Sequence, residues 1–293
     1  MIVGVRSDVA DVIAIHSAAG RRFEAGGVRS FVREQGSGPT VVLVHGVPVS
    51  SLVYRRVIVA LADQGVRAVA FDLPGLGLAD RPRDFDYTWT GLARWFGAAL
   101  DALGLERVHL VVHDVGGAVA GEWAVANPHR VQSLTALNTT LSPASFTPVW
   151  PMRPFRVRGI GELWLRGTPP AVFEALFRHI GLGDRRAMSS AEIQAHRTLL
   201  LRADGGRAFL RIMRGFELNQ AKQALLARLG QRPYPARVVW GDSDPAFDLD
   251  EMRAVQRILR VDDAVLLDAK HFLQEDQATS VAYAIADQVA PLG

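Results

Sequence analysis

The sequence predicts an α/β fold with a doubly wound, mostly parallel sheet and an inserted helical cap. Short apolar runs bounded by turns alternate with helical stretches along most of the 293 residues, the pattern of a parallel sheet covered on both faces. One stretch contains prolines and amphipathic helical pieces but no convincing buried strand. We therefore expect a first part of the core over 1–141, a cap over 142–233 and a second part of the core over 234–293.

The expected strands begin with two short alternating stretches, Arg22–Ala25 and Val28–Glu34, which are separated by glycines and predict an antiparallel hairpin. Six apolar runs predict the remaining strands: Thr40–Val44, Arg67–Phe71, Val108–Val112, Val131–Leu137, Arg237–Trp240 and Ala264–Leu267. The helices of the core are expected at Leu52–Gln64, Thr90–Leu103, Gly117–Ala126, Asp250–Leu259 and Ser280–Val289.

The cap is expected to consist of amphipathic helices at Ala171–Ile180, Ala191–Arg202 and Arg207–Leu229, because a structureless loop of this length is improbable in a compact chain. It is also basic. Between Arg153 and Arg232 there are 14 arginines and one lysine against six acidic residues. This positive charge could attract anionic substrates or bind a membrane surface. A helical face that is exposed to solvent is the simpler explanation.

Composition narrows the classes of function. The chain has no cysteine, which excludes disulfides and thiolate metal sites and is typical of a reducing compartment, so we expect a soluble cytoplasmic protein. Residues 1–8 lack the basic and apolar regions of a signal peptide, and no apolar run approaches the roughly 18 residues of a membrane span. The arginines lack the aromatic interleaving of a nucleic-acid module. The oligomeric state stays open.

The first motif of chemical interest is His45-Gly46-Val47, directly after an expected strand. Ligands of open parallel sheets bind beyond the carboxyl ends of the strands. The glycine permits a tight turn, so the N–H of Val47 is expected to form one half of an oxyanion hole. An ordinary turn at a strand end is the alternative. His45 is a candidate substrate contact.

The second motif is His113-Asp114-Val115-Gly116-Gly117, where a strand meets a helix between small residues. An aspartate has an unperturbed pKa of about 3.9, so it is ionised at neutral pH and needs no general base to act as a nucleophile. Its attack on a saturated carbon bearing a halide or an epoxide oxygen yields a stable alkyl ester. Val115 is expected to supply the second oxyanion N–H when water attacks that ester. The alternative is a structural aspartate that caps the helix.

The third motif follows the last expected strand and contains His271, which is placed to act as the base that activates water. The loop after the preceding strand contains Asp244, the expected carboxylate that orients His271. Asp242 and Asp248 in the same loop compete for that role and can equally stabilise the loop. The order Asp114, Asp244, His271 is that of nucleophile, acid and histidine in hydrolases with a strand-to-helix nucleophile turn.

With these motifs the chain resembles the aspartate-nucleophile branch of the α/β-hydrolase superfamily, and within it the haloalkane dehalogenases. The supporting segments are 45–51, 72–77 with 80–82, 244–247 and 271–276. The resemblance implies an α/β-hydrolase fold and cleavage of a carbon–halogen bond through a covalent ester, without a metal or an organic cofactor. It also implies a halide-binding tryptophan after the nucleophile and an asparagine after His-Gly, where this chain has Val115 and Val47.

Two other functions stay open. Epoxide hydrolases resemble the chain in tolerating an aliphatic residue at Val115, but they use cap tyrosines, and none of the tyrosines here lies between residues 142 and 232. Tyr234 lies just beyond the cap. A binding protein that retains the cleft without catalysis is the third possibility. In each case a small apolar substrate or ligand is expected in a cleft under the cap. The candidate lining residues are Trp150, Trp164, Phe155, Phe173 and Phe177, and Trp150 or Trp164 is a candidate halide donor.

Overall fold

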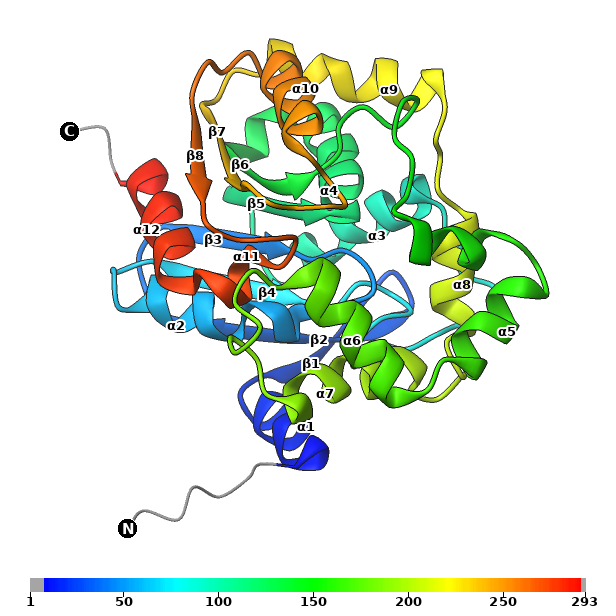
Figure 1. The fold of residues 1–293 in the computed structure, drawn as a ribbon. Helices are drawn as coiled ribbons and strands as arrows, with labels where there is room; N and C mark the ends of the chain where they lie inside the picture. Colours follow the sequence, from blue (N-terminus) through cyan, green and yellow to red (C-terminus); the bar gives the residue numbers. More distant parts are fainter. Residues whose placement is uncertain (1–7, 291–293) are drawn as a thin grey trace.

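The structure, a computed structural model, describes residues 8–290, and its centre is an eight-stranded sheet with helices on both faces (Figure 1). The strands lie in the order β1-β2-β4-β3-β5-β6-β7-β8. The strands from β4 to β8 in this order run parallel, whereas β1 and β2 form the expected antiparallel hairpin. The predicted fold class is confirmed. The bounds are β1 Arg21–Ala25, β2 Val28–Gln35, β3 Thr40–Val44, β4 Arg67–Phe71, β5 Val108–Asp114, β6 Val131–Thr139, β7 Ala236–Gly241 and β8 Ala264–Leu267.

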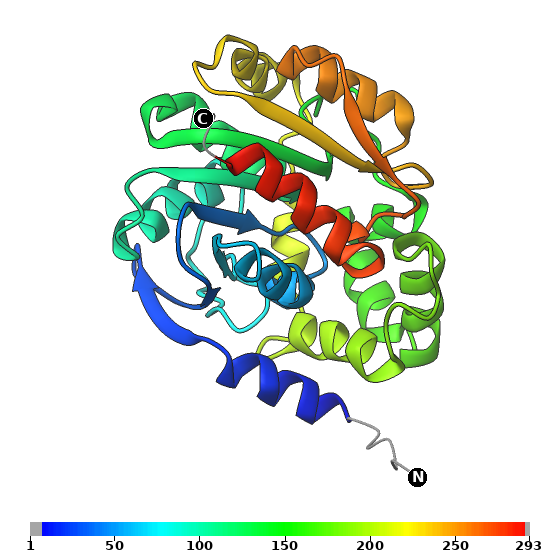
Figure 2. The same cartoon turned by 90° about the vertical axis from the view of Figure 1, so that its left-hand side faces the viewer.

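Both faces of the sheet are covered, which explains why the central strands are continuous apolar runs. Successive side chains of a strand point to opposite faces. In β5, Leu110 and Val112 pack into one hydrophobic cluster and Val111 packs into the other. Figure 2 shows α2 and α12 side by side over the second of these faces. The core helices are α2 Arg55–Ala62, preceded by the short helix η1 Ser51–Tyr54, α3 Trp89–Ala102, α4 Val115–Ala126, α10 Leu249–Leu259, α11 Leu273–Asp276 and α12 Ala278–Val289.

The N-terminal region contains a helix that the sequence did not predict, α1 Val9–Ala18. Asp8 and Asp11 begin it with a capping box, in which each side chain accepts from the backbone of the other residue. The helix packs against α7 (Ser190–Leu201) of the predicted cap. The expectation that no signal peptide is present rests on residues 1–8, of which 1–7 lie outside the described residues.

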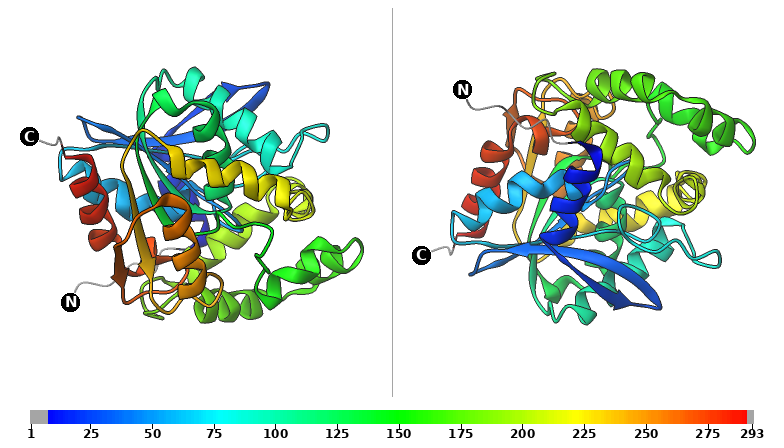
Figure 3. Two further views of the ribbon diagram at one scale, coloured as in Figure 1. Left: turned by 90° about the horizontal axis from the view of Figure 1, so that it is seen from above. Right: turned by 90° about the horizontal axis from the view of Figure 1, so that it is seen from below.

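The segment between β6 and β7 is helical, and within it the described residues form no strand (Figure 3). We keep the name cap for residues 142–233. One expectation was wrong: Arg207–Leu229 is not a single helix. It ends first at Gly215, where a Cβ would lie 2.6 Å from the carbonyl oxygen of Tyr87, and resumes after Asn219, whose side chain caps the next helix. The helices of the cap are η3 Trp150–Arg156, α5 Ile160–Gly167, α6 Pro170–Gly181, α7 Ser190–Leu201, α8 Arg207–Arg214, α9 Gln220–Ala227 and η4 Arg228–Gln231.

The last part of the cap returns to the core, since α9 contacts α4. Phe209 and Met213 of α8 are buried in the same hydrophobic cluster as α3 and α4. The cap and the core therefore share one hydrophobic interior. In the part of the chain that the structure describes, no helix is both long and apolar enough to cross a lipid bilayer.

Candidate functional site

Asp114 lies at a sharp turn between β5 and α4, with φ 52° and ψ −130°. This left-handed value of φ is unusual for a residue with a side chain. Small neighbours make the turn possible, since a Cβ at Gly116 would lie 2.6 Å from the carbonyl oxygen of Val44 and one at Gly117 would lie 2.0 Å from Oγ1 of Thr139. The Asp114 side chain makes no capping hydrogen bond to α4. A capping aspartate therefore does not account for this geometry.

Three strand ends bring the predicted triad together. Nε2 of His271 lies 3.8 Å from Oδ2 of Asp114, and Nδ1 of His271 is hydrogen-bonded to Oδ2 of Asp244 at 3.0 Å. All three residues are at least 92% buried, with relative exposures of 8%, 5% and 4% for Asp114, His271 and Asp244. A base that is oriented by a carboxylate and faces a second carboxylate is the arrangement needed for covalent catalysis followed by hydrolysis.

The two other acids of the loop that contains Asp244 make local contacts and do not contact His271. Asp248 accepts from the backbone N–H groups of Asp250 and Glu251 and so begins α10, whereas Asp242 is exposed and accepts from the hydroxyl of Ser243. Asp244 is the acid that reaches His271.

The turn His45-Gly46-Val47, which holds one of the expected oxyanion donors, lies against the aspartate. The backbone N–H of Val47 donates to Oδ1 of Asp114 at 2.7 Å. Gly46 is required by this approach, because a Cβ there would lie 2.0 Å from the same oxygen. The N–H of Val115 also favours the charged form of Asp114. Of the two expected oxyanion donors, the N–H of Val47 is therefore the one that is hydrogen-bonded to the carboxylate.

Burial and the neighbouring charged and polar groups shift the pKa values of the site in opposite directions. Desolvation raises the pKa of Asp114, although the charge of His271 and the N–H groups of Val115 and Val47 act to lower it. Burial lowers the pKa of His271, but Asp244 and Asp114 outweigh it and the pKa lies above its ordinary value. These two groups face each other at the centre of the site.

Beside the triad lies a cavity of about 130 Å³ between the core and the cap, several times the volume that one water molecule needs. Its walls are almost entirely apolar. Asp114, His271, Val47 and Val115 line it, together with four of the five predicted aromatic residues: Trp164, Phe155, Phe173 and Phe177.

Two predicted substrate contacts do not lie on this cavity. Trp150 is 58% exposed and packs beside Trp164 on the outside of the cap. The indole N–H of Trp164 donates to the carbonyl oxygen of Pro151 at 3.1 Å, so it is not free to bind a halide. Neither tryptophan offers the free donor expected for a halide.

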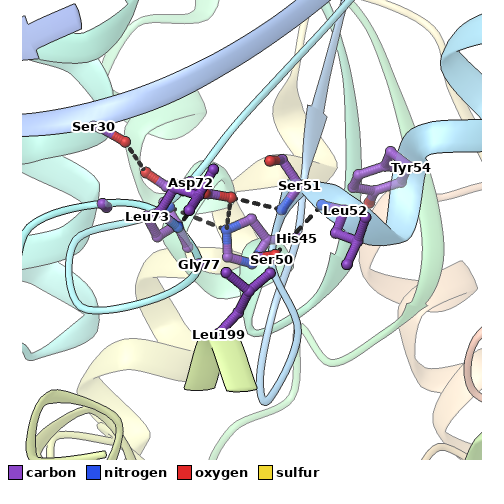
Figure 4. Close-up of polar contacts among 12 residues, drawn as sticks. Ser30, His45, Ser50, Ser51, Leu52, Tyr54, Asp72, Leu73, Gly77 and Leu199 are labelled. Carbon is purple, nitrogen blue, oxygen red and sulfur yellow. Dashed lines mark hydrogen bonds and ion pairs between the residues drawn. The ribbon is translucent and has the colours of Figure 1, made fainter. Parts of the chain in front are cut away.

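His45 is the second of these contacts, and Figure 4 shows its structural role. It is completely buried. Its Nδ1 is hydrogen-bonded to the carbonyl oxygen of Gly46 and its Nε2 accepts from the N–H of Leu73. The nearby carboxylate of Asp72 accepts from the N–H groups of Ser51 and Leu78. His45 and Asp72 thus connect the turn after β3 to the loop after β4, and the expected contact of His45 with substrate is corrected.

Sequence reasoning missed residues that support the triad. Nδ2 of Asn138 donates to Oδ2 of Asp244 at 2.6 Å, and Oδ1 of Asn138 accepts from the N–H of Gly241. Nε2 of His113 is hydrogen-bonded to the carbonyl oxygen of His271 at 2.8 Å. Asn138 follows directly after the predicted sixth strand, so its position at a strand end was the available signal. Within residues 8–290 there is no group of three histidine or acidic side chains that could hold a metal ion.

Comparison with known proteins gives consistent results. Residues 39–278 match the family model described as alpha/beta hydrolase fold. The chain is 31% identical over 287 residues to haloalkane dehalogenase 2 of Mycobacterium tuberculosis (strain ATCC 25618 / H37Rv), covering 92% of this chain and 94% of the relative. Bifunctional epoxide hydrolase 2 of Sus scrofa is 35% identical over 150 residues, 51% of this chain and 27% of that protein. Among solved structures, Cfl2 from Burkholderia cenocepacia has a TM-score of 0.82 at 27% identity, covering 92% and 95% of the two chains.

Proposed function

The chain belongs to the α/β-hydrolase family, with relatives that include haloalkane dehalogenases and epoxide hydrolases, and from this premise we propose that it hydrolyses its substrate through an ester on Asp114. The observation that carries the proposal is the position of the Asp114 carboxylate. It lies on an apolar cavity between the N–H of Val47 and the imidazole of His271. An ionised carboxylate in such a place can attack a saturated carbon without a base.

The two carboxylate oxygens have different surroundings, which suggests different roles. Oδ1 is held by the N–H of Val47, and Oδ2 faces His271. In the first step Oδ2 bonds to the carbon, and the electron pair of the broken bond leaves on the halide or the epoxide oxygen. In the second step His271 takes a proton from water, whose oxygen attacks Cγ of Asp114. Negative charge then develops on Oδ1, where the N–H groups of Val47 and Val115 stabilise it. The alcohol leaves with Oδ2 and receives the proton from His271.

Cleavage of a carbon–halogen bond is the first candidate. It is supported by the relative that matches 92% of the chain and by the apolar walls of the cavity. Trp89 lines the cavity, and its buried indole N–H has no partner among the described residues. We assign Trp89 as a halide donor in place of the tryptophan that Val115 replaces.

Hydrolysis of an epoxide is the second candidate. Val115 favours it, as does the match of about half the chain to an epoxide hydrolase. The hydroxyl of Tyr234 is buried without a partner in the described part of the chain, but Tyr234 is not among the residues that line the cavity. A proton donor for the epoxide oxygen is therefore the missing part of this candidate.

Isotope labelling tests the covalent step in the unmodified enzyme. One turnover in ¹⁸O-water with excess enzyme is expected to leave the product unlabelled, because its new oxygen comes from Asp114. The label should instead appear in the peptide that contains Asp114, measured by mass spectrometry. Label in the product of the first turnover would mean that water attacks the substrate directly, and the proposal would be wrong.

Removing the orienting carboxylate is expected to affect the second step. Asp244→Asn keeps the shape but favours the wrong tautomer of His271, so we expect kcat to fall by about 10⁴-fold, as in other triads. Formation of the ester should continue, because it does not require the base. Asp242→Asn is the matched control and should retain wild-type kcat, since Asp242 is exposed and does not contact His271. Equal losses in both variants would contradict the role of Asp244.

The pH dependence follows from the two shifted pKa values. Asp114 attacks only when ionised, and its pKa is raised, so kcat/KM should fall as the pH drops through a value above that of an ordinary aspartate. His271 activates water only when neutral, and its pKa is also raised. When hydrolysis of the ester limits turnover, kcat should therefore increase with pH up to a value above the ordinary histidine pKa. Steady-state kinetics between acidic and alkaline pH checks the expected pH dependence of kcat/KM and of kcat. A kcat that decreases as the pH rises over this range would contradict the assignment of His271 as base.

A further inference from the structure

One wall of the cavity contains a positive charge that the proposed chemistry does not use. Arg197 of α7 is the only arginine or lysine among the described residues that line the cavity. The acids and histidines on the same walls are Asp114 and His271, and both belong to the triad. A guanidinium group beside apolar walls loses hydration, so an anionic partner stabilises it.

Within residues 8–290 Arg197 has no such partner. Its Nη2 donates to the carbonyl oxygen of Thr168 at 3.3 Å, and no carboxylate of the described residues forms an ion pair with it. Two other partly buried arginines of the cap are paired, Arg178 with Glu174 at 2.8 Å and Arg214 with Glu162 at 2.7 Å. Arg197 differs from them in leaving most of its donors available to a ligand.

Arg197 contacts a residue that borders both the cavity and a second hollow in the cap. Its partner Thr168 lines the cavity and also a second hollow at the junction of α5 and α6. Trp164 likewise lines both spaces, whereas Asp114 and His271 line only the cavity. Figures 1 and 3 show these cap helices together on one side of the sheet. The other residues of the hollow are Ile160, Leu163, Gly167, Pro169 and Val172.

We propose that Arg197 binds the carboxylate of an amphiphilic substrate, whose apolar chain lies in the cavity and bears the carbon that Asp114 attacks. A carboxylate fits because the planar guanidinium presents parallel N–H donors to two oxygens. The excess of arginine in the cap adds a positive field that attracts anions. The identity of the reacting carbon rests on the proposed function, but the pairing with Arg197 does not.

Binding without turnover tests the pairing by itself. Straight-chain alkanoates of increasing length and the alcohols of equal length are titrated into the wild-type protein by calorimetry at low salt. We expect the best alkanoate to bind about tenfold more tightly than its alcohol, the effect of one charge-assisted hydrogen-bonded pair. Arg197→Gln should remove this difference. Arg197→Lys should retain part of it, because lysine keeps the charge but loses the planar fork.

Arg166→Gln is the matched control for the general charge of the cap. Arg166 is exposed on α5 and does not line the cavity. This variant should keep the full difference between acid and alcohol. A difference that Arg197→Gln retains, or equal binding of acid and alcohol by the wild type, would overturn the proposal. Thermal unfolding checks that each variant folds, and Arg197→Met provides a second neutral variant.

Turnover separates this proposal from the proposed function. Bromoalkanoates and epoxyalkanoates are compared with the corresponding alcohols, and kcat/KM is expected to be about tenfold higher for the acids in the wild type. The ratio should approach one in Arg197→Gln. If acids bind through Arg197 but neither bromides nor epoxides react, the proposed function fails and the pairing stands. If both acids and alcohols react with equal kcat/KM, the proposed function stands and the pairing fails.

Discussion

Replacing Asp114 with asparagine is expected to lower kcat/KM by about 10⁶-fold, the order of loss seen when a covalent nucleophile is removed from a triad. The amide has nearly the same shape but no charge, so it cannot form the alkyl ester. No adduct should be found on the peptide that contains residue 114 after exposure to a substrate. Product formation is measured with a large excess of substrate, and adducts are measured by intact-mass spectrometry.

The same variant should remain folded. Asparagine tolerates the left-handed backbone of residue 114 at least as well as aspartate does. Burial raises the pKa of Asp114, which means that the fold disfavours its charged form. A neutral side chain removes this desolvation cost, so the midpoint of thermal unfolding should equal or exceed that of the wild type. Activity within a hundredfold of the wild type would rule out Asp114 as the nucleophile.

Much of the core could be predicted because the local pattern agrees with the tertiary environment. The run Val108–Val112 is apolar because β5 is buried on both faces, and a turn at Leu103 and Gly104 precedes it. The predicted positions of Asp114, Asp244 and His271 relied on the same logic, since the carboxyl ends of parallel strands meet at one edge of a sheet. The sequence order of the three residues then predicted a role for each of them.

The remaining features depend on contacts between distant segments. The break in the cap helix at Gly215 follows from its close approach to the backbone of Tyr87, a contact with no local signal. The face of α7 that turns Arg197 toward the cavity is set by packing against α1 and α6. His45 follows a strand as the proposed catalytic residues do, yet its ring is directed at the backbone of Leu73. A position at a strand end therefore predicted the triad. It could not distinguish a histidine that supports the backbone from one that contacts the substrate.

Replacing His271 with glutamine is expected to separate the two chemical steps and to identify the leaving group. Alkylation of Asp114 needs no base, whereas release of the ester does, so the alkyl-enzyme should accumulate and its hydrolysis should slow by about 10⁶-fold. Intact-mass spectrometry follows exposure to separate panels of haloalkanes and epoxides. A haloalkane adds its alkyl group to the enzyme in place of a proton, and an epoxide adds its entire mass.

The outcome of this experiment depends on which leaving group the cavity stabilises. The cavity lacks a side-chain donor at Val47 and Val115, but it borders the indole of Trp89, whose N–H has no partner within residues 8–290. Adducts from haloalkanes alone would agree with that donor, and adducts from epoxides alone would require a different proton source. The double variant with Asp114→Asn should give no adduct from either panel, which shows that the label lies on Asp114. Tight binding of a small apolar ligand without any adduct would instead favour a binding protein. An aspartate in the position of a nucleophile forms an ester only if the cavity also stabilises the leaving group.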